Sequence, residues 1–496
     1  MSFIKRAESE VKCRLGISLS SHIYKLLVLI LLLAAVPAFA SATASSTGRH
    51  SCVISDIYKP GLSIDASTDV RALQAYQNAA AHMLKDHRFA ELDCLADGLR
   101  TRRERFPGGM WKLHVMYGGL ASPNLFPVHS TEGEWRNHLG SLRQWVANRP
   151  KSVTARVALA SALMGYAWTA RGHGFSDTVS ESGWDLFVQR AGEAKRVLDG
   201  ASRLGKKCPE SYAVMLTAAV AQQWSNSQIR ALFDEAITAE PEYYYYYRLY
   251  AQTLLPKWGG AEGAVDRFLQ QSADSLGSEK GDILYFQVAT NLICGCNDDQ
   301  GLKLSLPRIE RGFNAVEKQF GASMLNLNLL ASAATHAGEG DPVLADKAFR
   351  RIGDQWDRET WKKQEYFDSA REWAANYSKT ILKQRSMEAD ADSSTKGVDG
   401  ARYKSTVEEK LHGIAQQCAK GGGAFPQQFE TLVRIGAKGN VEEVKIYANA
   451  PLPICLYQTL MSSRDGDALF GPPPQAPYSI KLDLDAATLA PAVSKQ

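Results

Sequence analysis

The chain has 496 residues, a formal net charge of +4 at pH 7, 45% hydrophobic side chains and 22% charged side chains. This is ordinary globular composition, with enough length for two to four domains. Residues 1–40 carry a net +3 of that total, which leaves +1 for the rest. Nucleic-acid binders carry a strongly basic footprint, and no Lys/Arg stripe with interleaved aromatics supplies one, so we expect no nucleic-acid partner.

The amino terminus has the pattern of a secretory signal. Residues 26–40, LLVLILLLAAVPAFA, form an apolar run after Lys25 that ends in small residues, so we expect cleavage near Ala40. An uncleaved anchor is the alternative, but a spanning helix needs about 20 apolar residues and Pro37 would interrupt this one. We therefore expect an exported protein, periplasmic or extracellular, with no transmembrane segment after cleavage of residues 1–40.

Removal of the signal leaves seven cysteines, which tend to pair in an oxidising compartment. Cys418 and Cys455 belong to the same small C-terminal domain and are the pair most expected. Cys52 with Cys94 is a second possibility, although Cys94 in the apolar stripe of a helix also fits a small buried thiol. Residues 294–296, Cys-Gly-Cys, are too close for an easy bridge and lack the four ligands of a structural zinc site. We expect the unpaired thiol there.

The body of the protein is expected to be mainly α-helical. Residues 41–66 are small and polar and indicate a flexible lead-in, whereas residues 67–385 show apolar side chains at the three-to-four spacing of amphipathic helices. Pro209 and Pro241 each stand at the start of such a helix. Their separation of 32 residues is close to the period of about 34 residues of tetratricopeptide repeats. The interval from Pro150 to Pro209 is 59 residues, so the array is predicted to be irregular.

In the C-terminal part, the spacing of apolar side chains is no longer that of helices alone, because alternating strand patterns appear. Residues 386–403 are polar and are predicted to be an interdomain linker. Residues 404–496 then show a helix, an alternating strand over 429–435, a turn, a returning strand, a second helix and a third strand. The predicted order is α-β-β-α-β, a small α+β domain. In the first strand one face is expected to be buried, with Leu432 on the other face.

Four segments carry a first resemblance: RFPGGMWKL (105–113), YAWTARGHGFSDTVSESGW (166–184), CPESY (208–212) and EAITAEPEYYYYYRLYAQTLLPKWGG (235–260). They resemble a bacterial domain family of tetratricopeptide-like helices that has no assigned activity. This resemblance implies a fold and leaves the function open.

The C-terminal block carries a second resemblance. It reads V-x-I-x-x-x-G-x-V from Val433 to Val441 and F-x-x-P from Phe470 to Pro473, and in this it is similar to the C-terminal domain of TonB-type proteins. The resemblance implies a periplasmic module that pairs an exposed strand edge with another chain. The chain lacks the long Pro-rich spacer of energy-transducing members and its signal looks cleavable, so the resemblance leaves coupling to a proton-motive complex open.

Motifs of common enzymes are absent from the sequence. It has no Gly-x-Ser-x-Gly, no His-Glu-x-x-His and no phosphate-binding Gly-x-x-x-x-Gly-Lys-Ser/Thr. The histidines are scattered, and we expect no metal and no cofactor. The most site-like break is Arg171-Gly172-His173, with Asp177 and Glu181 nearby. The favoured alternative for this break is a helix C-terminus that Gly172 turns and Arg171 caps.

The run of five tyrosines at residues 243–247 is the other candidate. If the segment is helical, Tyr243, Tyr246 and Tyr247 share one face while Tyr244 and Tyr245 point elsewhere, so some phenols are predicted to be exposed. Such aromatics, together with Arg248, would suit a peptide or glycan platform in a helical array. The favoured alternative is packing between helices, with hydroxyls that find local partners.

Two functions of different classes follow. The first is a non-enzymatic envelope scaffold, in which the helical array binds a protein or peptide through Tyr243, Tyr246, Tyr247, Arg248, Arg171 and His173, and the C-terminal domain docks a second partner. The second is an envelope hydrolase or glycan-processing enzyme with a site near His173, Asp177 and Glu181.

Overall fold

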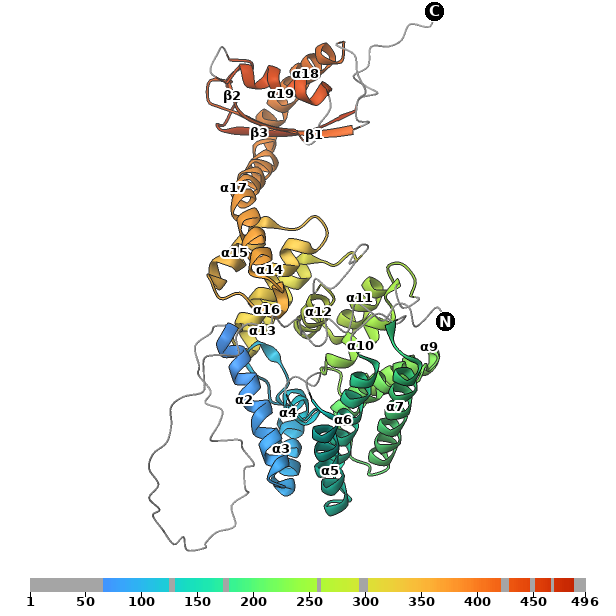
Figure 1. The fold of residues 1–496 in the computed structure, drawn as a ribbon. Coiled ribbons are helices and arrows are strands. Elements are labelled where there is room, and N and C mark those ends of the chain that lie inside the picture. Colours follow the sequence, from blue (N-terminus) through green and yellow to red (C-terminus); the bar gives the residue numbers. More distant parts are fainter. Residues whose placement is uncertain are drawn as a thin grey trace, which may run out of the picture. The chain divides into compact units, whose positions relative to one another are not determined.

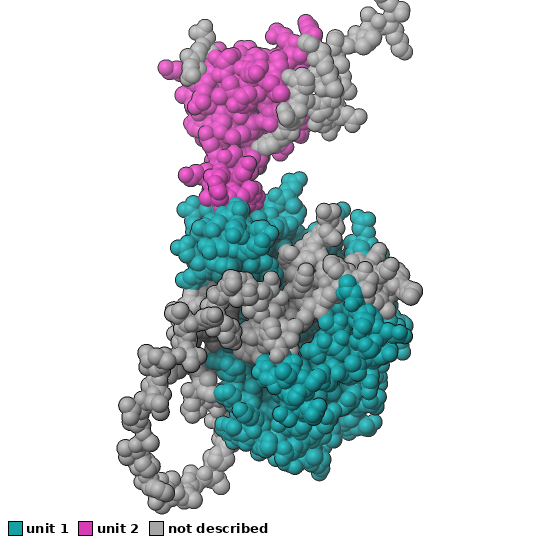
Figure 2. Space-filling model, viewed as in Figure 1, with its two compact units in different colours: residues 1–371 teal, residues 372–496 magenta. Residues whose placement is uncertain are grey.

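The computed structural model describes residues 66–124, 130–172, 178–256, 260–293, 302–420, 428–446, 451–464 and 468–485. The predicted signal and nearly all of the predicted lead-in lie outside these residues. The chain divides into two compact units, residues 1–371 and 372–496 (Figure 2). It is mainly helical, with a small three-stranded antiparallel sheet near the C-terminus, as the sequence predicted.

Unit 1 is built mainly from α-helices (Figure 1), and the residues that the structure describes also include the 3-10 helix η2. Their bounds are α2 (Ala66–Lys85), α3 (Phe89–Arg102), η2 (Pro107–Gly109), α4 (Lys112–Leu120), α5 (Glu132–Asn148), α6 (Val153–Arg171), α7 (Glu181–Ser202), α8 (Pro209–Ala221), α9 (Asn226–Ala239), α10 (Tyr245–Thr253), α11 (Ala264–Leu276), α12 (Ser278–Leu292), α13 (Leu306–Phe320), α14 (Met324–His336), α15 (Pro342–Ile352), α16 (Arg358–Trp361) and the first residues of α17 (Gln364–Ser394).

Local sequence explains where many of these helices begin. Thr131 before α5 and Ser225 before α9 form capping boxes, in which the side chain and the third helical residue satisfy each other's backbone N–H groups. Pro209 and Pro342 occupy the first position of α8 and α15, where a missing N–H group costs nothing. These starts are therefore determined by short-range chemistry.

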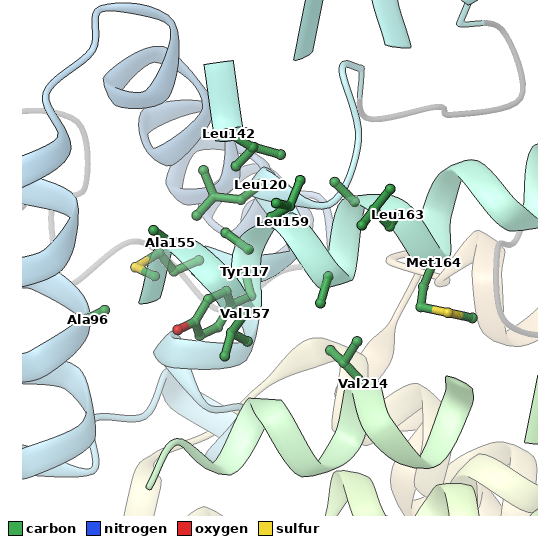
Figure 3. Close-up of a cluster of buried hydrophobic side chains, with 14 of the residues drawn as sticks. Ala96, Tyr117, Leu120, Leu142, Ala155, Val157, Leu159, Leu163, Met164 and Val214 are labelled. Carbon is green, nitrogen blue, oxygen red and sulfur yellow. The ribbon is translucent and has the colours of Figure 1, made fainter. Parts of the chain in front are cut away.

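The helices of unit 1 pack in a regular way. From α5 to α15 each helix contacts the next one in the chain, and the even-numbered helices α4, α6, α8, α10, α12 and α14 also contact one another in that order. The even-numbered helices thus form a continuous row. Figure 3 shows part of the core around this row, where Tyr117 of α4, Met164 of α6 and Val214 of α8 lie among other buried side chains.

A tight contact ties η2 to helices late in unit 1. The Gly108 N–H donates to the Gly321 carbonyl at 3.1 Å, and the Gly108 carbonyl accepts from Gln287 Nε2 and Asn326 Nδ2, both at 2.9 Å. Gly108 has φ +80°, and a Cβ on it would lie 2.5 Å from the Cβ of Ser323. The sequence Pro-Gly-Gly is therefore more than a break between helices, because only a glycine fits this approach.

Unit 2 holds the rest of α17, then α18 (Gly397–Ala419), β1 (Gln428–Ile435), β2 (Val441–Ile446), α19 (Pro451–Ser462) and β3 (Tyr478–Asp485). From α18 onward the order is the predicted α-β-β-α-β. The strands lie in the order β2-β1-β3, and both pairs are antiparallel. One face of β1, including Val433 and Ile435, packs with α18 and α19 in a single core. Cys418 of α18 and Cys455 of α19 form a disulfide, the pair that the sequence favoured, with Cα atoms 5.8 Å apart.

The prediction of an interdomain linker at residues 386–403 is wrong. Most of this segment is helical, because α17 continues to Ser394 and α18 begins at Gly397. The boundary between the two units lies earlier in the chain, within α17. Met387 and Ala391 of α17 are buried against Leu432 of β1, on the face that the sequence predicted to be exposed. Ser and Asp are only moderate helix formers, so the packing of Met387 and Ala391 on the sheet is the main support for a helix in this polar segment.

We predict that Gly108→Ala destabilises unit 1 far more than Gly205→Ala. Both glycines have positive φ, at +80° and +72°, but nothing lies within 4 Å of a Cβ at Gly205. The backbone cost is shared, so the overpacking against Ser323 should add about 1–3 kcal/mol for Gly108→Ala. Urea unfolding followed by tryptophan fluorescence measures the difference, and equal losses for the two variants would contradict the close approach.

We predict that the double variant Cys418→Ser, Cys455→Ser loosens unit 2 and leaves unit 1 unchanged. The disulfide closes a loop of 37 residues, for which chain-entropy arguments give about 4 kcal/mol. Hydrogen exchange of the amides in β1 and β3, measured on the full chain, should speed up, while exchange in α6 and α8 stays as in the wild type. Unchanged exchange in the sheet would show that the disulfide contributes little.

Candidate functional site

The five tyrosines are all buried, so the prediction that some phenols are exposed is wrong. Helix α10 begins only at Tyr245, and Tyr243 and Tyr244 precede it, so the five side chains do not follow one helical period. Their hydroxyls find local partners: Tyr246 donates to the Glu240 carbonyl at 3.0 Å and Tyr247 to the Pro241 carbonyl at 2.9 Å. Tyr246 and Tyr247 are thus packing residues, in line with the alternative that the sequence favoured.

A pocket of about 390 Å³ lies next to this tyrosine cluster. It is lined by residues of α4, α6, α8, α10 and α12, all from the row of even-numbered helices. Met164, Val214 and Leu249 contribute apolar wall, and Met164 and Val214 point into the space between α6 and α8 in Figure 3. Its size is within the usual range of small-ligand pockets.

A buried carboxylate forms one side of the pocket. Glu210, in the first turn of α8, is 6% exposed, and its Oε2 accepts from the Tyr243 hydroxyl and lies 2.9 Å from His114 Nδ1. Burial raises the pKa of Tyr243 well above its usual value, and the Glu210 carboxylate raises it further, so this phenol stays protonated and donates. The positive end of the helix dipole at the start of α8 also favours a carboxylate here.

The Glu210 contact also orients His114. Because Nδ1 of the ring faces the Glu210 carboxylate, Nε2 is the ring nitrogen left for a ligand. The imidazole stacks on Tyr245, with ring centroids 3.6 Å apart and an interplanar angle of 22°. His114 is 37% exposed at its side chain and lines the pocket, so its position is held on two sides.

Arg248 is the cation of the pocket. Its Nε donates to the Gln287 carbonyl at 2.8 Å and a terminal nitrogen donates to Gln287 Oε1 at 3.3 Å. The guanidinium lies over the Tyr244 ring, 4.5 Å from the centroid. Within the described part of the chain, these contacts come without an ion pair to any carboxylate. The pocket therefore combines an oriented histidine with an arginine whose charge is not neutralised by a direct partner.

The break at Arg171-Gly172 is the C-terminus of helix α6, which is the alternative that the sequence favoured. Arg171 is the last residue of α6, and Gly172, at φ +73°, donates its N–H to the Trp168 carbonyl. The Arg171 guanidinium lies near the rings of Trp168 and Trp184, at 5.7 and 5.1 Å. Glu181 is the first residue of α7.

His173 and Asp177 lie outside the described residues, so the structure does not show whether they join Glu181 in a site.

Of the predicted binding residues, the structure brings Arg248 to the pocket and connects Tyr243 to it through Glu210. Sequence analysis missed His114 and Glu210, which are 96 residues apart in the chain. His114 directly follows the segment 105–113, and Glu210 lies within 208–212; both segments carried the first resemblance. The one signal in the sequence was the position of Glu210 directly after Pro209, the proline that begins a helix.

The remaining cysteines are placed as follows. Cys94 is disulfide-bonded, and Cys52, its expected partner, lies outside the described residues. Cys208 is a buried free thiol whose sulfur lies 3.5 Å from the Tyr117 hydroxyl. A free thiol is thus present at a position that the sequence did not single out, and residues 294–296, where it was expected, are not described.

In the described ranges, no group of three or more His, Cys, Asp or Glu side chains is placed to hold a metal ion. No helix that the structure describes is long and apolar enough to cross a membrane. The chain matches no protein-family model, no curated protein and no solved structure.

We predict that Tyr243→Phe costs more stability than Tyr247→Phe. Tyr243 donates to a buried carboxylate, and loss of this hydrogen bond is expected to cost about 1.5–3 kcal/mol. Tyr247 donates to a neutral carbonyl, and loss of that hydrogen bond is expected to cost about 0.5–1.5 kcal/mol. Both variants remove one hydroxyl from the same aromatic cluster, so they are matched. Urea unfolding measures the free energies, and a smaller loss for Tyr243→Phe would exclude Glu210 as an ionised, phenol-dependent carboxylate.

Proposed function

We propose that the protein is a non-enzymatic, exported binding protein of the cell envelope. Its tetratricopeptide-like array takes a segment of a protein or peptide at the pocket of unit 1, and its TonB-like C-terminal domain docks a second partner. The observation that carries the proposal is the pocket itself. Five helices of one row converge on it and bring apolar wall, an oriented histidine and an unneutralised arginine to a single cavity.

The hydroxyls of the pocket favour binding over catalysis. Ser161 donates to the Val157 carbonyl at 2.9 Å and Thr217 to the Ala213 carbonyl at 3.1 Å, each one turn back in its own helix. A nucleophilic hydroxyl needs a base as its hydrogen-bond partner, and these two instead have backbone acceptors. His114, which has the orientation of a general base, is engaged by Glu210 and faces no activated nucleophile among the described residues.

The sheet of unit 2 supports the docking role. With the order β2-β1-β3, the outer sides of β2 and β3 have no paired strand among the described residues. Unpaired strand edges present backbone donors and acceptors to an extended segment of another chain. Export is supported by the signal pattern of residues 1–40 and by the Cys418–Cys455 disulfide, since such bridges persist in oxidising compartments.

Photo-crosslinking tests the binding role of the pocket. A photoreactive phenylalanine analogue replaces Leu249, which lines the pocket, in the full chain expressed in its native envelope, and the control carries it at Val188, exposed on α7. We expect a discrete adduct from the Leu249 position, with a peptide or protein identified by mass spectrometry, and none from Val188. No adduct at Leu249, or the same adducts from both positions, would overturn the proposal.

A further inference from the structure

We propose that the unit 1 pocket recognises an organic carboxylate with an apolar body, either a small free acid or the C-terminal carboxylate of a peptide. Arg248 holds the carboxylate, His114 provides a second polar contact, and Met164, Val214 and Leu249 receive the apolar part. This inference rests on the proposed binding function and names the ligand class of the same pocket.

The Arg248 guanidinium is held in place before any ligand arrives. Its two hydrogen bonds to Gln287 use two of the five N–H donors, and the ring of Tyr244 supports the plane of the group. Fixing a flexible side chain in advance removes most of the ordering cost that binding would otherwise carry. The remaining N–H groups match the two oxygens of a carboxylate, which Arg recognises in a bidentate manner.

Charge balance favours a single negative charge on the ligand. Three groups of the pocket carry or accept charge: Arg248 is positive, the buried Glu210 carboxylate is negative, and His114 is neutral or positive. The summed charge of these three groups is therefore between zero and +1. A carboxylate with one negative charge fits this sum, whereas a phosphate monoester, with about 1.5–2 negative charges at pH 7, would leave excess negative charge beside Glu210.

His114 is positioned to reinforce the same selectivity. Its Nδ1 is committed to Glu210 at 2.9 Å, so only Nε2 is available to a ligand. The ring is held by stacking on Tyr245, and Tyr245 and Arg248 line the same pocket. An N–H group at Nε2 would donate to a ligand carboxylate, and the Glu210 contact at Nδ1 fixes the direction in which Nε2 points.

The apolar wall gives the second half of the recognition. A pocket of about 390 Å³ exceeds what a carboxylate alone occupies, and Met164, Val214 and Leu249 cannot satisfy a polar ligand body. Binding an apolar or aromatic group there removes its surface and theirs from water. The ligand is therefore expected to need both parts, a charged end and an apolar body.

The experiment uses N-acetylphenylalanine and N-acetylphenylalaninamide as probes, titrated into the full chain by calorimetry or ligand-observed NMR. The two probes share the apolar body and differ at one end, where the acid has a charged carboxylate and the amide a neutral group of similar shape. We expect the acid to bind at least tenfold more tightly than the amide. Arg248→Gln should remove this difference, and Arg248→Lys should restore part of it because the charge returns without the bidentate geometry.

A second variant tests the pocket without touching Arg248. Asn291 lines the pocket, and Asn291→Asp changes its charge at nearly constant shape, so it should weaken the acid several-fold and leave the amide unchanged. The control Arg230→Gln removes an exposed arginine of α9 that pairs with Asp234, and it should have no effect on either probe.

The outcomes separate the two proposals. Equal binding of acid and amide in the pocket would overturn the carboxylate inference and leave the binding function in place. The same holds if neither probe binds although crosslinking at Leu249 succeeds. Absence of both probe binding and crosslinking would overturn the two proposals together.

Discussion

The buried carboxylate of Glu210 is the constraint on which the organisation of unit 1 around the pocket depends. An ionised carboxylate that is withdrawn from water costs several kcal/mol, so partners have to be brought to it. Tyr243 and His114 are those partners, and they come from the segment before α10 and from α4. One charge thereby joins three parts of the chain that are far apart in sequence.

The position of α10 follows from the same contact. Because Tyr243 is committed to Glu210 and Tyr246 and Tyr247 donate to the turn before the helix, the tyrosine run is anchored at both ends. Tyr245 then supports His114, and Arg248 comes to the pocket one turn later. The aromatic cluster therefore supports two polar groups of the pocket, and its Tyr245 also lines the pocket.

The approach of η2 also acts on α12, a helix that lines the pocket. Gln287, which accepts from Arg248, also donates to the Gly108 carbonyl. The glycine contact and the pocket thus share one side chain, so the orientation of Arg248 depends on backbone atoms 140 positions earlier in the chain.

Unit 2 is held together by separate contacts. Met387 and Ala391 bury the second face of β1, and the Cys418–Cys455 disulfide joins α18 and α19.

The sequence by itself determined the features that short-range chemistry controls. Helix period, the proline that begins α8, alternation in β1 and the α-β-β-α-β order were all legible, as was the pair Cys418 and Cys455, whereas Pro241 lies in a turn before α10 and does not begin it. Only the tertiary structure decided the rest. The pairing of His114 with Glu210, the burial of all five tyrosines, the helical state of residues 386–394 and the burial of Leu432 depend on contacts between distant segments. Local patterns carry no information about which distant surface will cover a residue, and burial is what turned these polar and aromatic side chains into a candidate site.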